Sequence, residues 1–155
     1  MLYDTGKYTM KISKELTEEE KAQVRKEDFE EWLKASKEFL DTAKFNLEKG
    51  FLKVGAFVTH QAAEKALCAT LLYYTGYKPR LHNLKKLINI VAKHSRDVAN
   101  ALPRTTPEDV HLFSLLQRGY IDSRYKKNYF INADELENMI ENVERLQEAV
   151  EKIGG

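Results

Sequence analysis

The sequence contains little cysteine, proline or glycine. Of its 155 residues, one is cysteine, three are proline and seven are glycine. A single cysteine, Cys68, excludes a disulfide framework and a cysteine-rich zinc site, and it favours a reducing, intracellular compartment. The scarcity of proline and glycine leaves long stretches of the chain free to form helices.

The sequence also lacks the apolar segments that direct a chain to or through a membrane. Its first residues, MLYDTGKYTMK, contain no apolar core of a signal peptide. No run reaches the roughly 18 apolar residues that a membrane-spanning helix needs. We therefore expect a soluble, cytoplasmic protein with no membrane partner.

Helical periodicity is the strongest pattern that the sequence does contain. Apolar residues recur at spacings of three and four between Lys26 and Lys49, and Gly50 then marks the end of a helix. The nearly all-apolar stretch 52–74 predicts a second, central helix. Further helices are predicted from His82 or Asn83 to before Pro103, from Thr106-Pro107 onward, and from a cap at Asn132 onward.

These helices predict an all-α fold, an up-and-down bundle of about five helices with a four-helix core and one extra helix. The bundle is predicted to be a single domain over residues 26–155. Residues 1–25 are predicted to form an N-terminal arm, mobile or in part helical. Thr17 and Glu20 make a capping box there, which either opens a separate turn or leads into the first long helix.

Charge is unevenly distributed, although the net charge is only +1 at pH 7. Residues 78–104 hold seven Lys or Arg and one acid, whereas residues 132–155 hold seven acids and two bases. The two segments either complement one another across the bundle or between subunits, or the basic segment offers a surface that binds anions.

The central helix carries a polar stripe made of His60, Gln61, Glu64 and Lys65. At about 100° per residue, these four side chains share an arc of roughly 140°, and alanines line much of the rest. They form either i,i+4 pairs on a half-exposed face or part of a binding site. His60 and Glu64 have no supporting metal-ligand motif, so we expect neither a metal nor a cofactor.

Short motifs spread over roughly residues 28–152 match one family in order along the chain. They are Trp32 and Ala35, Gly50, the His60–Lys65 block, Gly76, His82-Asn83-Leu84, Leu87 and Ser123-Arg124-Tyr125. In these motifs the sequence resembles the HEPN family of small helical bundles. The resemblance implies a homodimer that binds nucleotide or RNA and is the accessory partner of a separate minimal nucleotidyltransferase, in a toxin–antitoxin-like or defence context.

The segment 117–129 is the second candidate region, because it interleaves four cations with three tyrosines. Stacking faces and cations suit bases and phosphates, but the tyrosines could equally pack at the end of the bundle with the cations solvated. The resemblance favours ligand contact through Arg124 and Tyr125. The full set of candidate ligand-binding residues is His60, Gln61, Glu64, Lys65, Arg80, His82, Arg124 and Tyr125.

His82 has two interpretations. Beside Arg80 at the start of a helix it could bind an anion, or it could cap that helix or pack on the loop.

A catalytic role has little support in the sequence. The resemblance to HEPN ribonucleases implies a motif of an Arg and a His separated by four to six residues. No His lies at that distance after Arg124. Arg104 and His111 have the spacing, but Pro107 interrupts them. We expect a non-catalytic module. A metal-independent ribonuclease using Arg104 and His111, or a plain helical interaction protein, are the alternatives.

Overall fold

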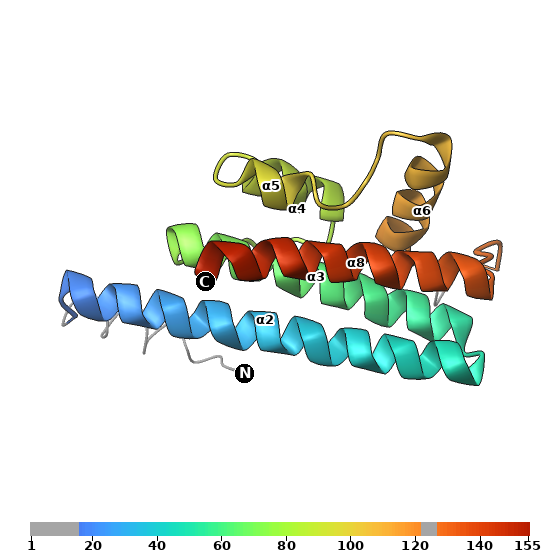
Figure 1. Cartoon of the computed structure of the whole chain (residues 1–155), viewed down its shortest axis with the longest axis horizontal. Helices are drawn as coiled ribbons and strands as arrows, with labels where there is room; N and C mark the ends of the chain where they lie inside the picture. The colour runs from blue at the N-terminus through green and yellow to red at the C-terminus, as the bar shows by residue number, and fades with distance from the viewer. Residues whose placement is uncertain (1–15, 122–126) are drawn as a thin grey trace.

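The computed structural model describes residues 16–121 and 127–155, and every regular element in this part of the chain is a helix (Figure 1). Three long helices form the body: α2 (Glu18–Lys49), α3 (Leu52–Thr75) and α8 (Ala133–Gly154). Each packs against the other two, with α3 and α8 running in the opposite direction to α2. The predicted all-helical fold is confirmed.

Between α3 and α8, the described residues form three shorter helices: α4 (Leu84–Val91), α5 (Arg96–Ala99) and α6 (Pro107–Arg118). In Figure 1 they lie on the opposite side of α3 and α8 from α2. The third helix predicted by the sequence is therefore divided in two, because α4 ends at Val91 and Ser95 begins α5 by accepting a hydrogen bond from the amide of Val98.

The helix ends follow local capping chemistry. The Thr17 hydroxyl accepts from the Glu20 amide at 3.1 Å while the Glu20 carboxylate accepts from the Thr17 amide at 2.8 Å. This capping box opens α2 itself, so the long helix begins within the segment assigned to the N-terminal arm. Gly50 ends α2 with φ of 76°, a left-handed conformation that glycine adopts without strain. Residues 1–15 of the arm lie outside the described residues.

The centre of the bundle is α3, whose alanines are fully buried. Small side chains allow neighbouring backbones to approach closely, and a buried polar contact joins all three long helices at this level. The Ser36 hydroxyl on α2 donates to the carbonyl of Ala62 on α3 at 2.6 Å and accepts from the Gln147 amide of α8 at 2.8 Å. This contact fixes the positions of the three helices relative to one another.

The acidic helix α8 pairs with α2 rather than with the basic segment 78–104. Lys37 pairs with Glu151, and Lys44 lies 2.6 Å from Glu144. Within residues 16–121 and 127–155, no ion pair joins segment 78–104 to α8. The cations of that segment are therefore not neutralised by the acids of α8. None of the described helices is long and apolar enough to cross a membrane.

Candidate functional site

The polar stripe of α3 is buried at its centre. His60 is fully buried and Glu64 is 7% exposed, whereas Gln61 and Lys65 are half-buried. The interpretation of the stripe as i,i+4 pairs on a half-exposed helix face therefore does not hold for His60 and Glu64. Buried polar groups require hydrogen-bond partners, and the partners of these two side chains identify what the stripe holds in place.

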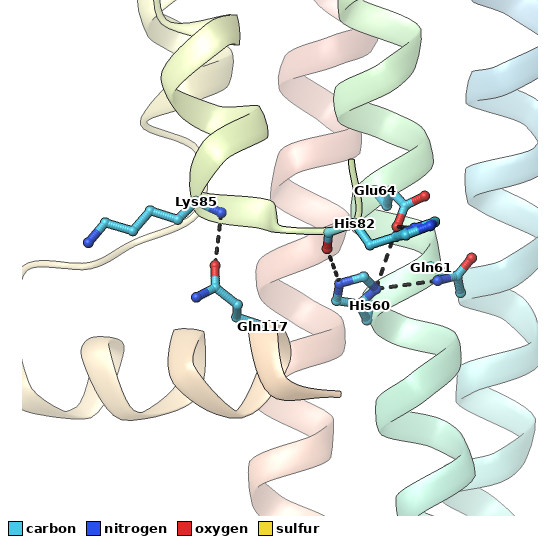
Figure 2. A network of polar contacts seen from close by, with 6 residues as sticks. All are labelled: His60, Gln61, Glu64, His82, Lys85 and Gln117. Atoms are coloured by element: carbon cyan, nitrogen blue, oxygen red, sulfur yellow. Dashed lines mark hydrogen bonds and ion pairs between the residues drawn. The ribbon is translucent and has the colours of Figure 1, made fainter. Parts of the chain in front are cut away.

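His60 holds the backbone of the loop that follows α3. Its Nε2 lies 3.0 Å from the carbonyl oxygen of His82, and the Gln61 amide makes a long contact of 3.4 Å to its Nδ1 (Figure 2). Burial lowers the pKa of His60 to about 4, so its ring is neutral at pH 7. A carbonyl only accepts, so Nε2 carries the hydrogen and donates it, and Nδ1 is left as an acceptor.

Glu64 holds the side chain of the same loop residue. Its Oε1 lies 3.0 Å from Nδ1 of His82, and because a carboxylate accepts, Nδ1 donates. The Glu64 side chain is only 10% exposed, whereas that of His82 is 55% exposed. His82 is thus anchored twice, by its carbonyl and by its ring, and its Nε2 has no partner among the described residues.

Tyr120, which follows α6, covers one face of the His82 ring. The two rings are stacked, with centroids 4.4 Å apart and planes 11° apart, and Tyr120 also lies 5.4 Å from His60. Stacking of this kind adds to the burial of both rings. His82 therefore packs on its loop, and the cap of α4 is Asn83, whose side chain accepts from the Lys86 amide.

The ammonium groups of two lysines lie close to one tryptophan ring, on the side of the stripe next to α2. The ammonium groups of Lys65 and Lys78 lie 4.9 Å and 4.8 Å from the ring centroid of Trp32, and Lys65 is also 5.0 Å from the ring of Phe39. No ion pair to either ammonium exists in the described part of the chain. This surface therefore carries two positive charges beside one aromatic ring, and no carboxylate of the described residues pairs with either of them.

The comparisons with known proteins identify the family. A family model described as the HEPN domain matches residues 29–153. The chain belongs to the HEPN domain family. The crystal structure of an archaeal HEPN homologue is similar in fold, with a TM-score of 0.56 and 20% sequence identity over 82% of this chain and 98% of that one. No curated protein matches the sequence.

The HEPN match over residues 29–153 includes all of the sequence-predicted site residues, and the structure brings four of them together. His60, Gln61, Glu64 and His82 form one network (Figure 2). Lys65 turns instead towards Trp32, and Arg80 is exposed two residues before His82. Arg124 and Tyr125 lie outside the described residues, so their part in the site stays a prediction.

The alternative catalytic pair does not converge in this HEPN domain. The Arg104 guanidinium lies 5.4 Å from the ring of Phe113, whereas Nε2 of His111 lies 2.7 Å from Oε2 of Glu135 on α8. The two residues line different cavities. In this arrangement the two side chains contact different partners, and the ribonuclease alternative stays a prediction.

Cys68 is unsuited to act as a nucleophile. It is 1% exposed, and burial raises the pKa of its thiol to about 12, with the Glu64 carboxylate adding to the effect. A thiol with such a pKa is protonated at neutral pH and unreactive.

Sequence reasoning missed three contributors to the site. Lys78 was counted only as part of a basic segment, and Trp32 only as a family position. Tyr120 lies in the segment 117–129, but nothing in the pattern distinguished it from the other two tyrosines. Of those, Tyr129 is fully buried and donates to the carbonyl of Leu115 at 2.8 Å, so it packs inside the bundle.

Proposed function

We propose that this HEPN protein is a non-catalytic nucleotide-binding module that serves as the partner of a separate nucleotidyltransferase. The observation that carries the proposal is the pair of ammonium groups, Lys65 and Lys78, that share the ring of Trp32 without a carboxylate partner among the described residues. Two such charges attract a phosphate, and the exposed Arg80 in the same loop adds a guanidinium suited to bidentate contact.

The base of the nucleotide stacks, in this proposal, on the exposed part of His82. Tyr120 covers one face of that ring and Glu64 occupies its Nδ1, yet the side chain is 55% exposed. The imidazole thus has a fixed orientation before any ligand arrives, and a rigid aromatic face loses little freedom on binding. Base stacking tolerates different bases, which suits a nucleotide or the end of an RNA strand.

The proposal is tested by titrating AMP and ATP while following the fluorescence of Trp32, the sole tryptophan in the sequence. A ligand phosphate that draws the two ammonium groups off the ring changes its surroundings directly. We expect Lys78→Gln and Arg80→Gln each to weaken binding roughly 10- to 150-fold, since a charge-assisted hydrogen bond contributes about 1.5 to 3 kcal/mol. Isothermal titration provides the affinity independently of fluorescence.

Lys93→Gln is the matched control, because Lys93 is an exposed lysine of the same basic segment and is remote from Trp32 in the contacts that the structure shows. Equal weakening in all three variants would mean non-specific attraction to the basic segment. Absence of binding by either nucleotide at millimolar concentration would favour a plain interaction protein.

The proposed assembly has its own tests. Light scattering should give twice the 18.0 kDa mass of the chain if the domain forms the homodimer proposed from its family, and a monomer mass at micromolar concentration would refute the dimer. The partner is tested by sedimentation of the protein mixed with a minimal nucleotidyltransferase from the same source. Separate boundaries for the two proteins would refute the partnership while leaving nucleotide binding untouched.

A further inference from the structure

A cavity of about 740 Å³ lies between α4, α6 and the segment that connects α5 to α6. It is separated from the His60–His82 network by a hydrogen bond of 2.8 Å from the backbone amide of Lys85 to Oε1 of Gln117. Figure 2 shows the Lys85 side chain and the Gln117 amide nitrogen extending from this bond away from the network. The cavity has the size of typical small-molecule sites, roughly 300 to 1,000 Å³.

The charged side chains that line the cavity are all positive, and the hydroxyls of Thr105 and Ser114 add groups that either donate or accept. Lys85 and Arg104 bring two positive charges, and Asn100 contributes an amide. Gln117 uses its oxygen for the Lys85 amide, so its NH₂ group is left as a donor with no partner in the described part of the chain. No carboxylate belongs to the residues that line the cavity, all of which are described. Such a lining attracts an anion.

The remaining lining suits a planar ring. The Arg104 guanidinium lies 5.4 Å from the ring of Phe113, so the lining brings a flat cation and an aromatic ring close together. Pro103 and Val110 add apolar surface beside it. A ring that stacks here would place a phosphate attached to it within the part of the cavity that holds the cations.

We propose that this cavity is a second ligand site, which binds a phosphorylated small molecule carrying a planar ring. The site shares no residue with the Lys65–Lys78 surface, and its argument does not depend on the function proposed for that surface. Charge and shape act together here: the cations select the phosphate, and the guanidinium, proline and phenylalanine select the ring.

The test is a titration of the ¹⁵N-labelled protein with AMP, CMP and flavin mononucleotide, with inorganic phosphate and adenosine as separate arms. The side-chain amides of Asn100 and Gln117 report on the cavity, and the indole N–H of Trp32 reports on the other surface. We expect at least one ring-bearing phosphate to shift both amides saturably, at least tenfold more tightly than phosphate or adenosine alone.

Four substitutions, one of them a control, test the assignment to this cavity. Lys85→Gln and Arg104→Gln should each weaken the amide response at least tenfold. Lys86→Gln, which removes an exposed charge at the next position of the same helical turn without lining the cavity, should leave it unchanged. Val110→Trp, at a position that is 53% exposed, should obstruct the apolar part of the cavity and weaken the response at least tenfold without changing the charge.

The outcomes separate the two proposals. Saturable shifts at Trp32 alone would overturn the cavity site and leave the proposed function standing. Shifts confined to Asn100 and Gln117 would support the cavity site and overturn the proposed function of the Lys65–Lys78 surface. Absence of saturable amide shifts with all three nucleotides, or equal weakening by Lys86→Gln, overturns the cavity site.

Discussion

The buried imidazole of His60 should make the stability of this protein depend on pH in a way that one substitution removes. Burial lowers its pKa from 6.5 to about 4. Between these values the unfolded chain binds a proton that the native state excludes, so the free energy of unfolding rises with pH. The stabilisation is complete above pH 6.5 and is lost as pH falls towards 4.

The size of the effect follows from the difference between the two pKa values. Each pH unit is equivalent to about 1.4 kcal/mol, so the whole interval corresponds to roughly 3 kcal/mol. That is a large part of the 5 to 15 kcal/mol by which domains of this kind are stable. His60→Gln removes the titrating group and keeps a side-chain N–H that can donate to the carbonyl of His82.

The assay is urea unfolding followed by circular dichroism, at intervals from pH 4 to 7.5. We expect the stability advantage of the wild type over His60→Gln to shrink by roughly 3 kcal/mol between pH 7 and pH 4. Glu64 and His82 are present in both proteins, so the comparison isolates the change at position 60. His94→Gln, which replaces an exposed histidine stacked on Tyr74, should parallel the wild type. Parallel pH profiles for the wild type and His60→Gln would refute the reasoning.

Three further outcomes are expected. Ser36→Ala should lower the free energy of unfolding by about 1 to 3 kcal/mol in urea, because it leaves the buried amide of Gln147 without its acceptor. Gly119→Ala should also destabilise the fold, by roughly 1 to 3 kcal/mol in the same assay, since the added Cβ would lie 2.8 Å from the carbonyl oxygen of Ala56. Structured and unstructured RNA, incubated with the purified protein and analysed by gel electrophoresis, should stay intact. Cleavage by the wild type that disappears in His111→Ala would contradict this expectation.

Helix starts were predictable because capping chemistry is local. The capping boxes at Thr17, Thr106 and Asn132 each involve a residue only three positions away, and all three are present in the structure. The break between α4 and α5 was missed because residues 92–95 contain neither glycine nor proline. The signal available there was Ser95 itself, a good N-cap within an otherwise continuous apolar pattern.

The candidate site was predictable only in part, because its contacts are long-range. The polar stripe follows from helical period, and its small neighbours indicated burial. The partner of Glu64 depends on how the loop after α3 folds back. This partner, His82, is 18 residues away in the sequence, so the pattern of one helix could not predict it. Likewise, Lys65 and Lys78 converge on Trp32 only because α2 packs beside α3 at this level. Helical periodicity describes one face of one helix, and it does not indicate which side chains of different helices or loops come into contact.

The two buried members of the stripe act on the surface without being part of it. His60 and Glu64 bind the carbonyl and the ring of His82, and those two bonds fix the end of the loop that carries Lys78 and Arg80. A neutral imidazole and a carboxylate are both costly to bury without hydrogen-bond partners. If the loop left α3, His60 and Glu64 would lose their partners or become exposed to solvent, so this movement is unfavourable. The same desolvation that holds His60 neutral thus keeps the exposed cations in a fixed arrangement. A buried polar pair beneath the loop supplies the order that the proposed binding surface needs.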